Sequence, residues 1–333
     1  MKKILRFLLL FILSLCCFST SSKNDIITTS KEIEKIDDVI LGGDTIGLHI
    51  KTNVQIVGKY EVLTNDGNVK PWEYSNIQDG DIIYAIDNNI INSNDDLNSV
   101  VKNSKMNSLT IILIRNEEMI NTNIKVVKNE KDINSIGLYV KDHITGIGTL
   151  TFINSKTNKF ASLGHNVSNA SNSGTILESS IKGVKKGTRG VPGEKYAIIG
   201  KDEIGVIEKN CNVGVFGTFN KQNQNNTIPL IKASQVKTGK AKIATVINGN
   251  EIKYYDIDIT EVAKQKETEI KGIKFKIVDE ELINSTGGVI QGMSGSPIIQ
   301  DDCLVGAVSH VIVNDPIYGF GVFAEWMYYN TLN

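Results

Sequence analysis

The chain has 333 residues, of which 41% are hydrophobic and 22% are charged, and its formal net charge is −1. This length allows two ordinary domains with sizeable cores. A near-neutral charge gives no reason to expect a nucleic acid as partner.

The first 22 residues predict a targeting segment. Lys2, Lys3 and Arg6 precede an apolar run of about a dozen residues, from Phe7 to Phe18. Such a run suits a signal peptide better than a spanning helix. An uncleaved membrane anchor is the alternative, and residues 23–37 read as a linker. In either case we expect the remaining chain to lie outside the cytoplasm.

Residues 38–127 predict a separate domain. A glycine loop at Gly42 leads into a strand, and Gly80-Asp-Ile-Ile begins a strand, a turn and a short strand. A helix follows with Ser93 or Asn94 as its N-cap, and a closing hairpin ends the domain. This order resembles a PDZ domain of the bacterial protease type.

The PDZ resemblance implies a peptide site at the segment Ile46, Gly47, Leu48 and His49, which matches the loop that binds a peptide carboxylate. Backbone N–H groups there can hold a peptide added to the edge of a sheet. The expected occupant is a PDZ peptide ligand or this chain's own N-terminal segment. A purely structural β domain without a ligand is the alternative.

Residues 128–134 are polar and predict an exposed linker, and residues 135–333 predict a second domain. Its short apolar strands, many glycines and lack of a long helix indicate a pair of β-barrels. No phosphate loop or metal-ligand spacing occurs, so we expect neither a cofactor nor a metal. Cys211 and Cys303 are the only cysteines after the targeting segment, and the sequence does not say whether they pair.

The hexapeptide Gly292-Met-Ser-Gly-Ser-Pro297 suggests a nucleophile loop. Glycine accepts backbone angles that are closed to other residues, so the loop can present the Ser294 hydroxyl. The N–H groups of Gly292 and Ser294 are the expected oxyanion hole. A simple β-turn between two strands is the alternative interpretation, because short motifs often match by chance.

A serine nucleophile needs a base, and the chain has four histidines. His165 follows a predicted hairpin, whose strands 148–153 and 159–163 flank a polar turn, so it can project into a cleft. His310 lies in an apolar run and is expected to be a strand residue near the site. His49 and His143 are expected on the surface.

The acid that orients the imidazole is less clear from the residues alone. Asp256 and Asp258 alternate along a predicted strand. Asp315 precedes a proline, which suits a turn. Asp279 follows a Lys/Ile alternation at the end of a strand.

Three segments resemble the stage IV sporulation protein B peptidases of endospore-forming bacteria: Gly164-His165, the block from Thr286 to Gln300, and Val311 to Pro316. The resemblance covers the chain from about residue 38 to the end. It implies a chymotrypsin-like catalytic triad of His165, Asp279 and Ser294. Ser296 is then a structural neighbour of the nucleophile.

The same resemblance implies a signalling endopeptidase in the space between the two forespore membranes. Its substrates would be its own N-terminal region and a regulatory membrane protein, and that cleavage would release a late mother-cell sigma factor. A catalytically inactive adaptor that only binds peptides is the alternative. A protease-chaperone of the high-temperature-requirement type is disfavoured, because there the PDZ domain follows the peptidase.

Overall fold

The computed structural model describes residues 34–220 and 226–332. The predicted targeting segment, residues 1–22, and residues 23–33 of the predicted linker lie outside these ranges. The described chain is mainly β, as the sequence predicts. Within these ranges, no helix combines the length and apolar character needed to cross a membrane.

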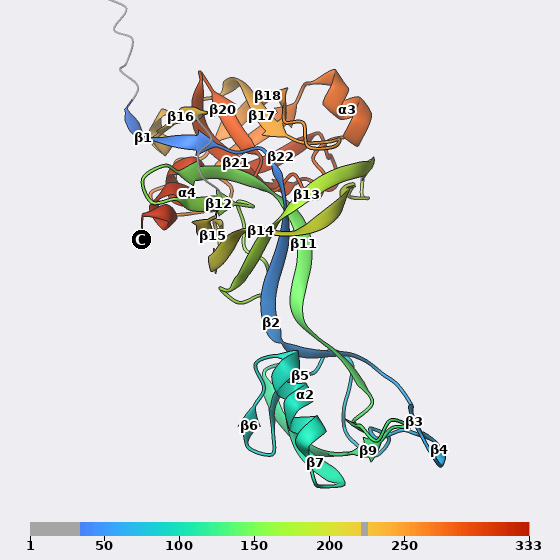
Figure 1. Cartoon of the computed structure of the whole chain (residues 1–333). Helices are drawn as coiled ribbons and strands as arrows, with labels where there is room; N and C mark the ends of the chain where they lie inside the picture. Colours follow the sequence, from blue (N-terminus) through green and yellow to red (C-terminus); the bar gives the residue numbers. More distant parts are fainter. Residues whose placement is uncertain (1–33, 221–225, 333) are drawn as a thin grey trace, which may run out of the picture. The chain divides into compact units, whose positions relative to one another are not determined.

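Six antiparallel strands close a first barrel (Figure 1). In order around the barrel they are β2 (Thr45–Lys59), β11 (Leu138–Asn154), β12 (Lys159–Ser162), β15 (Gly214–Phe219), β14 (Glu194–Cys211) and β13 (Gly174–Lys185). Every second residue of the first half of β2 points inward, so Ile46, Leu48 and Ile50 are buried with Phe160 of β12. Burial of each such side chain stabilises the fold by roughly 1.5–3 kcal/mol.

Six further antiparallel strands close a second barrel. They are β17 (Gly239–Thr245), β18 (Lys253–Val262), β19 (Ile273–Ile277), β22 (Tyr318–Phe323), β21 (Cys303–Val311) and β20 (Pro297–Gln300). Alternation along β19 buries Ile273, Phe275 and Ile277 completely. The pair of closed barrels confirms the predicted architecture of the second domain.

Two strands outside both barrels connect them. β1 (Lys35–Leu41) pairs with β11 of the first barrel and with β16 (Thr227–Ile231). β16 in turn pairs in parallel with β21 of the second barrel. Residues 35–37 therefore belong to a strand that pairs with the first barrel and with β16, and not to a linker, which corrects the predicted linker end at residue 37.

A small domain is built between β2 and β11, and its core includes Val54, Ile83, Leu97 and Ile111. Its elements are β3 (Val62–Thr64), β4 (Gly67–Val69), β5 (Ile82–Ile86), β6 (Asn89–Ile90), α2 (Asn94–Asn103), β7 (Ser108–Arg115), β8 (Glu118–Lys125), β9 (Val127–Lys128) and β10 (Asn134–Ser135). The strand–turn–strand, the helix capped by Ser93 and the closing hairpin all occur as predicted.

The boundaries of the two domains differ from the predicted 38–127 and 135–333. The first half of β2 belongs to the first barrel, where it pairs with β11 and β13. Its second half belongs to the small domain, together with the first half of β11. The predicted linker 128–134 ends in the paired strands β9 and β10. The peptidase-like part is therefore discontinuous in sequence, and the long pair of strands β2 and β11 serves both parts (Figure 1).

The helices outside the small domain are short. They are α3 (Glu280–Thr286), α4 (Ala324–Tyr328) and the 3-10 turns η1 (Ala233–Gln235) and η2 (Tyr329–Thr331). The residue that precedes α3, Asp279, caps that helix.

Candidate active site

The loop before β20 carries Ser294 and can only be built with glycine. Gly292 and Gly295 both have φ of +91°, in the region that disfavours residues with a Cβ atom. A Cβ atom on Gly295 would lie 2.1 Å from the carbonyl oxygen of Thr149 and 2.5 Å from the N–H nitrogen of Leu163. The loop therefore packs its backbone directly against the first barrel.

A second tight turn presents His165, just after β12. Leu163 and Gly164 both have φ of +68°, and the N–H of Gly164 donates to the carbonyl of Ser162. A left-handed conformation is unfavourable for leucine, and such backbone strain gathers at functional sites. The Leu163 side chain is buried, which holds the turn in place.

Ser294 and His165 form a hydrogen-bonded pair across the two barrels. His165 Nε2 lies 2.9 Å from Ser294 Oγ, and His165 Nδ1 lies 2.8 Å from the backbone oxygen of Asn166. A carbonyl oxygen only accepts, so Nδ1 carries the proton and Nε2 is left to accept from the hydroxyl. This is the tautomer that a general base for Ser294 requires.

Two peptide planes of the nucleophile loop are held by their carbonyl groups, which leaves their N–H groups on the opposite side. The carbonyl of Gln291 accepts from the N–H of Lys195 at 3.0 Å, and the carbonyl of Met293 accepts from the N–H of Ser296 at 2.9 Å. The N–H of the same peptide plane lies opposite each carbonyl. These are the N–H groups of Gly292 and Ser294, and among the described residues neither has an acceptor. The expected oxyanion donors are thus available.

Two threonines of strand β11 hold this loop by hydrogen bonds to its carbonyl groups. The Thr149 hydroxyl donates to the carbonyl of Gly292 at 2.9 Å, and its N–H donates to the carbonyl of Ser294 at 2.9 Å. The Thr151 hydroxyl donates to the carbonyl of Gly295 at 2.7 Å. Both threonines are fully buried. Neither threonine was predicted as part of the site, although threonine at alternate positions of a buried strand is an unusual pattern that could have indicated this role.

Ser296 is not placed to act as the nucleophile. Its side chain is fully buried, and its hydroxyl lies 3.4 Å from Thr149 Oγ1. Its N–H holds the loop carbonyl of Met293. The serine that lies beside the imidazole is Ser294, as the sequence predicts.

A buried lysine lies beside the same loop. A Cβ atom on Gly292 would lie 3.1 Å from Lys195 Cδ. The Lys195 ammonium donates to the Thr245 hydroxyl at 2.9 Å. Burial lowers the pKa of Lys195 to about 7, since a low-polarity environment disfavours the charged form. No motif or periodic pattern in the sequence points to Lys195.

His310, on β21, lies beside the catalytic imidazole. The ring centroids of His165 and His310 are 5.5 Å apart. His310 Nδ1 is buried and has no hydrogen-bond partner in the described part of the chain. Burial, and then the neighbouring His165 and Lys271, lower the pKa of His310. A neutral ring here avoids a second positive charge when His165 takes a proton.

The structure does not bring Asp279 to His165. One carboxylate oxygen of Asp279 accepts from the N–H of Leu282 at 2.9 Å, and the other accepts from the N–H of Asp256 at 3.3 Å. The first contact is that of an N-cap residue, which satisfies a free N–H in the first turn of a helix. In the described chain, no carboxylate is bonded to His165, whose Nδ1 has the Asn166 carbonyl instead. The sequence Asp279-Glu-Glu-Leu could have indicated a cap.

The other candidate acids also have different surroundings. Asp256 pairs with Lys242 at 3.4 Å, and Asp258 lies on the same strand, β18. Asp315 closes a turn, as predicted, because its N–H donates to Ile312 and its carbonyl accepts from Tyr318.

The predicted carboxylate-binding loop, Ile46 to His49, is wrong. These residues lie in the middle of the barrel part of β2. On one side they pair with β11, and on the other side with β13. Both edges of the strand are thus used within the barrel, so its backbone cannot accept an added peptide. The glycine loop before it is bound to the barrel, because the N–H groups of Gly42 and Gly43 donate to the carbonyls of Thr151 and Leu150.

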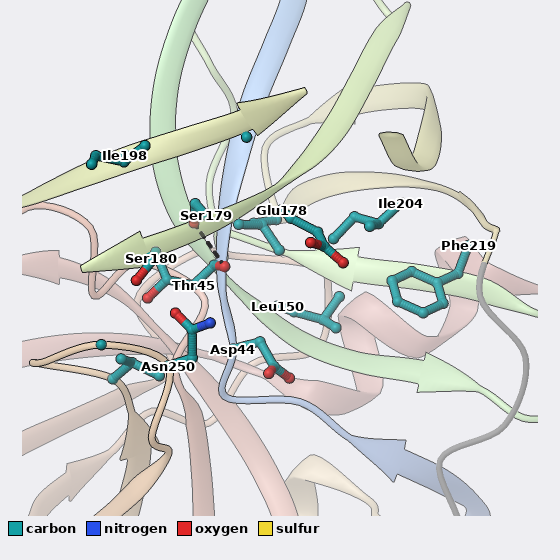
Figure 2. Close-up of a pocket in the computed structure, with 14 residues that line it drawn as sticks. Asp44, Thr45, Leu150, Glu178, Ser179, Ser180, Ile198, Ile204, Phe219 and Asn250 are labelled. Atoms are coloured by element: carbon teal, nitrogen blue, oxygen red, sulfur yellow. Dashed lines mark hydrogen bonds between the residues drawn. The ribbon is translucent and has the colours of Figure 1, made fainter. Parts of the chain in front are cut away.

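A separate cavity of about 350 Å³ lies between strands of the first barrel and the loop after β17 of the second barrel, which contributes Val246, Gly249 and Asn250. Its lining includes neither His165 nor Ser294 (Figure 2). Asp44, Glu178, Leu150 and Phe219 contribute to its wall. Ser179 donates to the carbonyl of Thr45 at 2.9 Å across one side. No group of three or more possible metal ligands occurs in the residues with described positions.

Cys211 and Cys303, the two cysteines among the described residues, are free thiols, so they do not pair with each other. Cys303 is buried, and burial raises the pKa of its thiol. Neither takes part in the contacts around Ser294.

A serine hydroxyl, an imidazole of the matching tautomer and free N–H donors, held at the contact of two closed β-barrels, define a chymotrypsin-like serine peptidase. The chain belongs to the family SpoIVB peptidase S55, whose sequence pattern it matches over residues 132–328. No curated protein matches it in sequence. It is similar to the crystal structure of Rv3671c from M. tuberculosis H37Rv, in an inactive serine-to-alanine form, with 17% identity and a TM-score of 0.32. That similarity covers 56% of this chain and 80% of the other.

Proposed function

We propose that the chain is an endopeptidase in which Ser294 attacks the peptide carbonyl and His165 Nε2 takes the hydroxyl proton. The observation that carries this proposal is the 2.9 Å contact between the two atoms, beside two unpaired N–H groups. The carbonyl oxygen of the substrate would become an oxyanion held by Gly292 and Ser294. The proton on His165 would then pass to the leaving amine.

The third member of the catalytic group is the backbone carbonyl of Asn166 in this arrangement. It fixes the tautomer of His165, which is the part of the acid's role that a neutral acceptor can perform. It gives less stabilisation of the imidazolium than a carboxylate would, because it carries no full charge. The family resemblance assigns the acid to Asp279, whose observed contacts support a capping role.

Membership of the SpoIVB peptidase family supports a narrower proposal. The substrates would be the chain's own N-terminal region and a regulatory membrane protein, whose cleavage activates a late mother-cell sigma factor. The enzyme would work outside the cytoplasm, between the two forespore membranes. An inactive peptide-binding adaptor is disfavoured, because such a protein has no need of a serine and an imidazole held in reactive geometry.

The test uses the purified chain, Ser294→Ala and the matched control Ser296→Ala. We expect an activated-serine probe to label the wild type and Ser296→Ala but not Ser294→Ala. Mass analysis should show self-cleavage products in the same two proteins only. Labelling of a folded Ser294→Ala protein, or loss of labelling in a folded Ser296→Ala protein alone, would refute the assignment of the nucleophile.

A further inference from the structure

The cavity of about 350 Å³ is formed by segments that are distant in the sequence (Figure 2). Strand β2 and the residue before it supply residues 44–46, strand β13 supplies residues 178–180, and the loop after β17 supplies Asn250. A volume of this size lies in the range of pockets that bind small molecules. The cavity is separate from the catalytic pair, because neither His165 nor Ser294 lines it.

Thr45 gives this cavity a buried polar group that the described chain does not use. The residue is only 6% exposed, and its Oγ1 atom has no hydrogen-bond partner among the residues with described positions. Its carbonyl oxygen, by contrast, accepts from the Ser179 hydroxyl at 2.9 Å. A buried hydroxyl without a partner is costly, and valine would fill the same space without that cost. A ligand in the cavity would supply the missing partner.

Further neutral hydrogen-bonding groups lie near this hydroxyl. Figure 2 shows Thr45, Ser180 and Asn250 together at one side of the cavity. Hydroxyl and side-chain amide groups can both donate and accept. This side of the wall therefore suits a hydroxyl or another neutral polar group of a ligand.

Two carboxylates, Asp44 and Glu178, also line the cavity, and no lysine, arginine or histidine is among the described residues of its wall. Each of the two acids also takes part in an interaction within the chain. An ionised carboxylate has about four acceptor positions on its two oxygens, so one partner does not exhaust it. The wall thus favours a ligand that carries N–H donors and a positive charge.

The remaining wall is apolar. Leu150, Ile204 and Phe219 belong to the buried core of the first barrel, and Figure 2 shows them on the side of the cavity away from Ser180. Val246, from the second barrel, adds a further apolar side chain. An apolar wall with a few polar groups on one side is typical of pockets for small organic molecules.

We propose that this cavity is a binding site for a small organic cation, with an apolar body, a primary ammonium group and a neutral hydrogen-bonding group. The ammonium group donates to the carboxylates of Asp44 and Glu178. The apolar body packs against Leu150 and Phe219, and the neutral group bonds the Thr45 hydroxyl. Such a ligand contacts both barrels and stays apart from the site that cuts peptides.

The test measures binding of L-phenylalaninol to the full chain carrying Ser294→Ala, by calorimetry and by the midpoint of thermal unfolding. At pH 7 this amino alcohol is a cation with a phenyl ring and a hydroxyl. We expect saturable binding and a higher midpoint, because a ligand that binds only the folded state stabilises it. The neutral 3-phenylpropane-1,2-diol, in which a hydroxyl replaces the ammonium, should bind at least about tenfold more weakly, since hydrogen bonds between charged groups are lost.

Variants of the wall assign this binding to the cavity. Glu178→Gln removes one charge and should weaken binding of the amino alcohol by about tenfold, whereas Thr45→Val removes one neutral bond and should weaken it by about threefold or more. Without ligand, Thr45→Val should be at least as stable as the parent, because an unsatisfied hydroxyl is lost. Glu203→Gln is the matched control and should bind normally, since Glu203 is exposed and does not line the cavity.

Several results would overturn the proposal. They are a lack of saturable binding, equal affinity for the amino alcohol and the diol, and equal affinity of the parent, Glu178→Gln and Thr45→Val proteins. If Glu178→Gln does not fold, Thr45→Val and Ser180→Leu decide, because the larger side chain at position 180 takes up space in the cavity. Undiminished binding to folded proteins with these two changes would place the ligand elsewhere.

Discussion

The Thr149 hydroxyl donates to the carbonyl oxygen of Gly292 at 2.9 Å, so one side chain of the first barrel holds the peptide plane between Gly292 and Met293 in the nucleophile loop. Thr149 lies at the middle of β11 and is fully buried. The geometry of the Ser294 loop therefore depends on a residue 143 positions away from Gly292.

Thr149→Val should lower both stability and activity. The change keeps the shape but leaves the Gly292 carbonyl unsatisfied, which costs about 1–3 kcal/mol. We expect kcat/KM to fall by roughly tenfold or more, since each 1.4 kcal/mol is a factor of ten. Thr149→Ser keeps the hydroxyl and is the matched control. Equal kcat/KM for the valine and serine variants would show that the hydroxyl does not position the loop.

Gly292→Ala should lose oxyanion stabilisation. Its φ of +91° is strained for alanine, and the new Cβ atom would lie 3.1 Å from Lys195 Cδ. A shift of the peptide plane between Gln291 and Gly292 would displace the Gly292 N–H from the oxyanion hole. Loss of one such donor typically lowers kcat by about 10²–10³-fold. Gly190→Ala is the control, because Gly190 has φ of +79° but open space around it. If both variants turn over substrate at the same rate, the Gly292 N–H is not a donor.

The effect of Asp279→Asn distinguishes a helix-capping role of Asp279 from a role as the catalytic acid. Asparagine caps helices about as well as aspartate, so we expect near-normal stability and turnover. Asp279→Ala should lose about 0.5–2 kcal/mol of stability, with activity reduced only as far as folding is. A fall of about 10⁴ in kcat for a folded Asp279→Asn protein would instead restore the acid of a triad.

The buried amine of Lys195 should make the free energy of unfolding depend on pH. Burial lowers its pKa from an ordinary value of 10.5 to about 7. Between these two values the unfolded chain binds more protons than the folded one, so this group makes the free energy of unfolding rise with pH. Below about pH 7 both states are protonated, and the full cost of burying the ammonium remains.

Lys195→Met removes that dependence. In a Ser294→Ala background, we expect its free energy of unfolding in urea to exceed that of the parent at pH 7, and the difference to shrink by pH 9. The exposed Lys185→Met serves as control and should show a constant difference. A constant difference for Lys195→Met as well would mean that burial does not lower the pKa of Lys195.

The local signals in the sequence were sufficient for much of this site. The glycines around Ser294 and the short hairpin before His165 depend on nearby residues only, so their patterns predict them. The N-cap at Ser93 is local in the same way. The contact between His165 and Ser294 was expected from their chemistry, since a serine nucleophile needs a base.

The remaining features depend on contacts between distant segments. The segment Ile46–His49 follows a glycine loop in either a PDZ domain or a barrel, and only its partners on β11 and β13 decide between them. Asp279 has the same identity in a cap and in a triad. The Asn166 carbonyl, which orients His165, belongs to the backbone and has no sequence signal.

Because β2 and β11 are shared with the barrel, the small domain is an insertion between two paired barrel strands. His49 pairs with Thr145, directly before the chain enters that domain on β2 and after it returns on β11. Residues 51–143 are thus an insertion into one β-hairpin of the barrel, and a short turn could replace them because closing a loop depends only weakly on its length. A deletion of residues 38–127 would instead remove Ile46 and Ile50 from the barrel core. Evolution could exchange the inserted module without redesigning the catalytic scaffold.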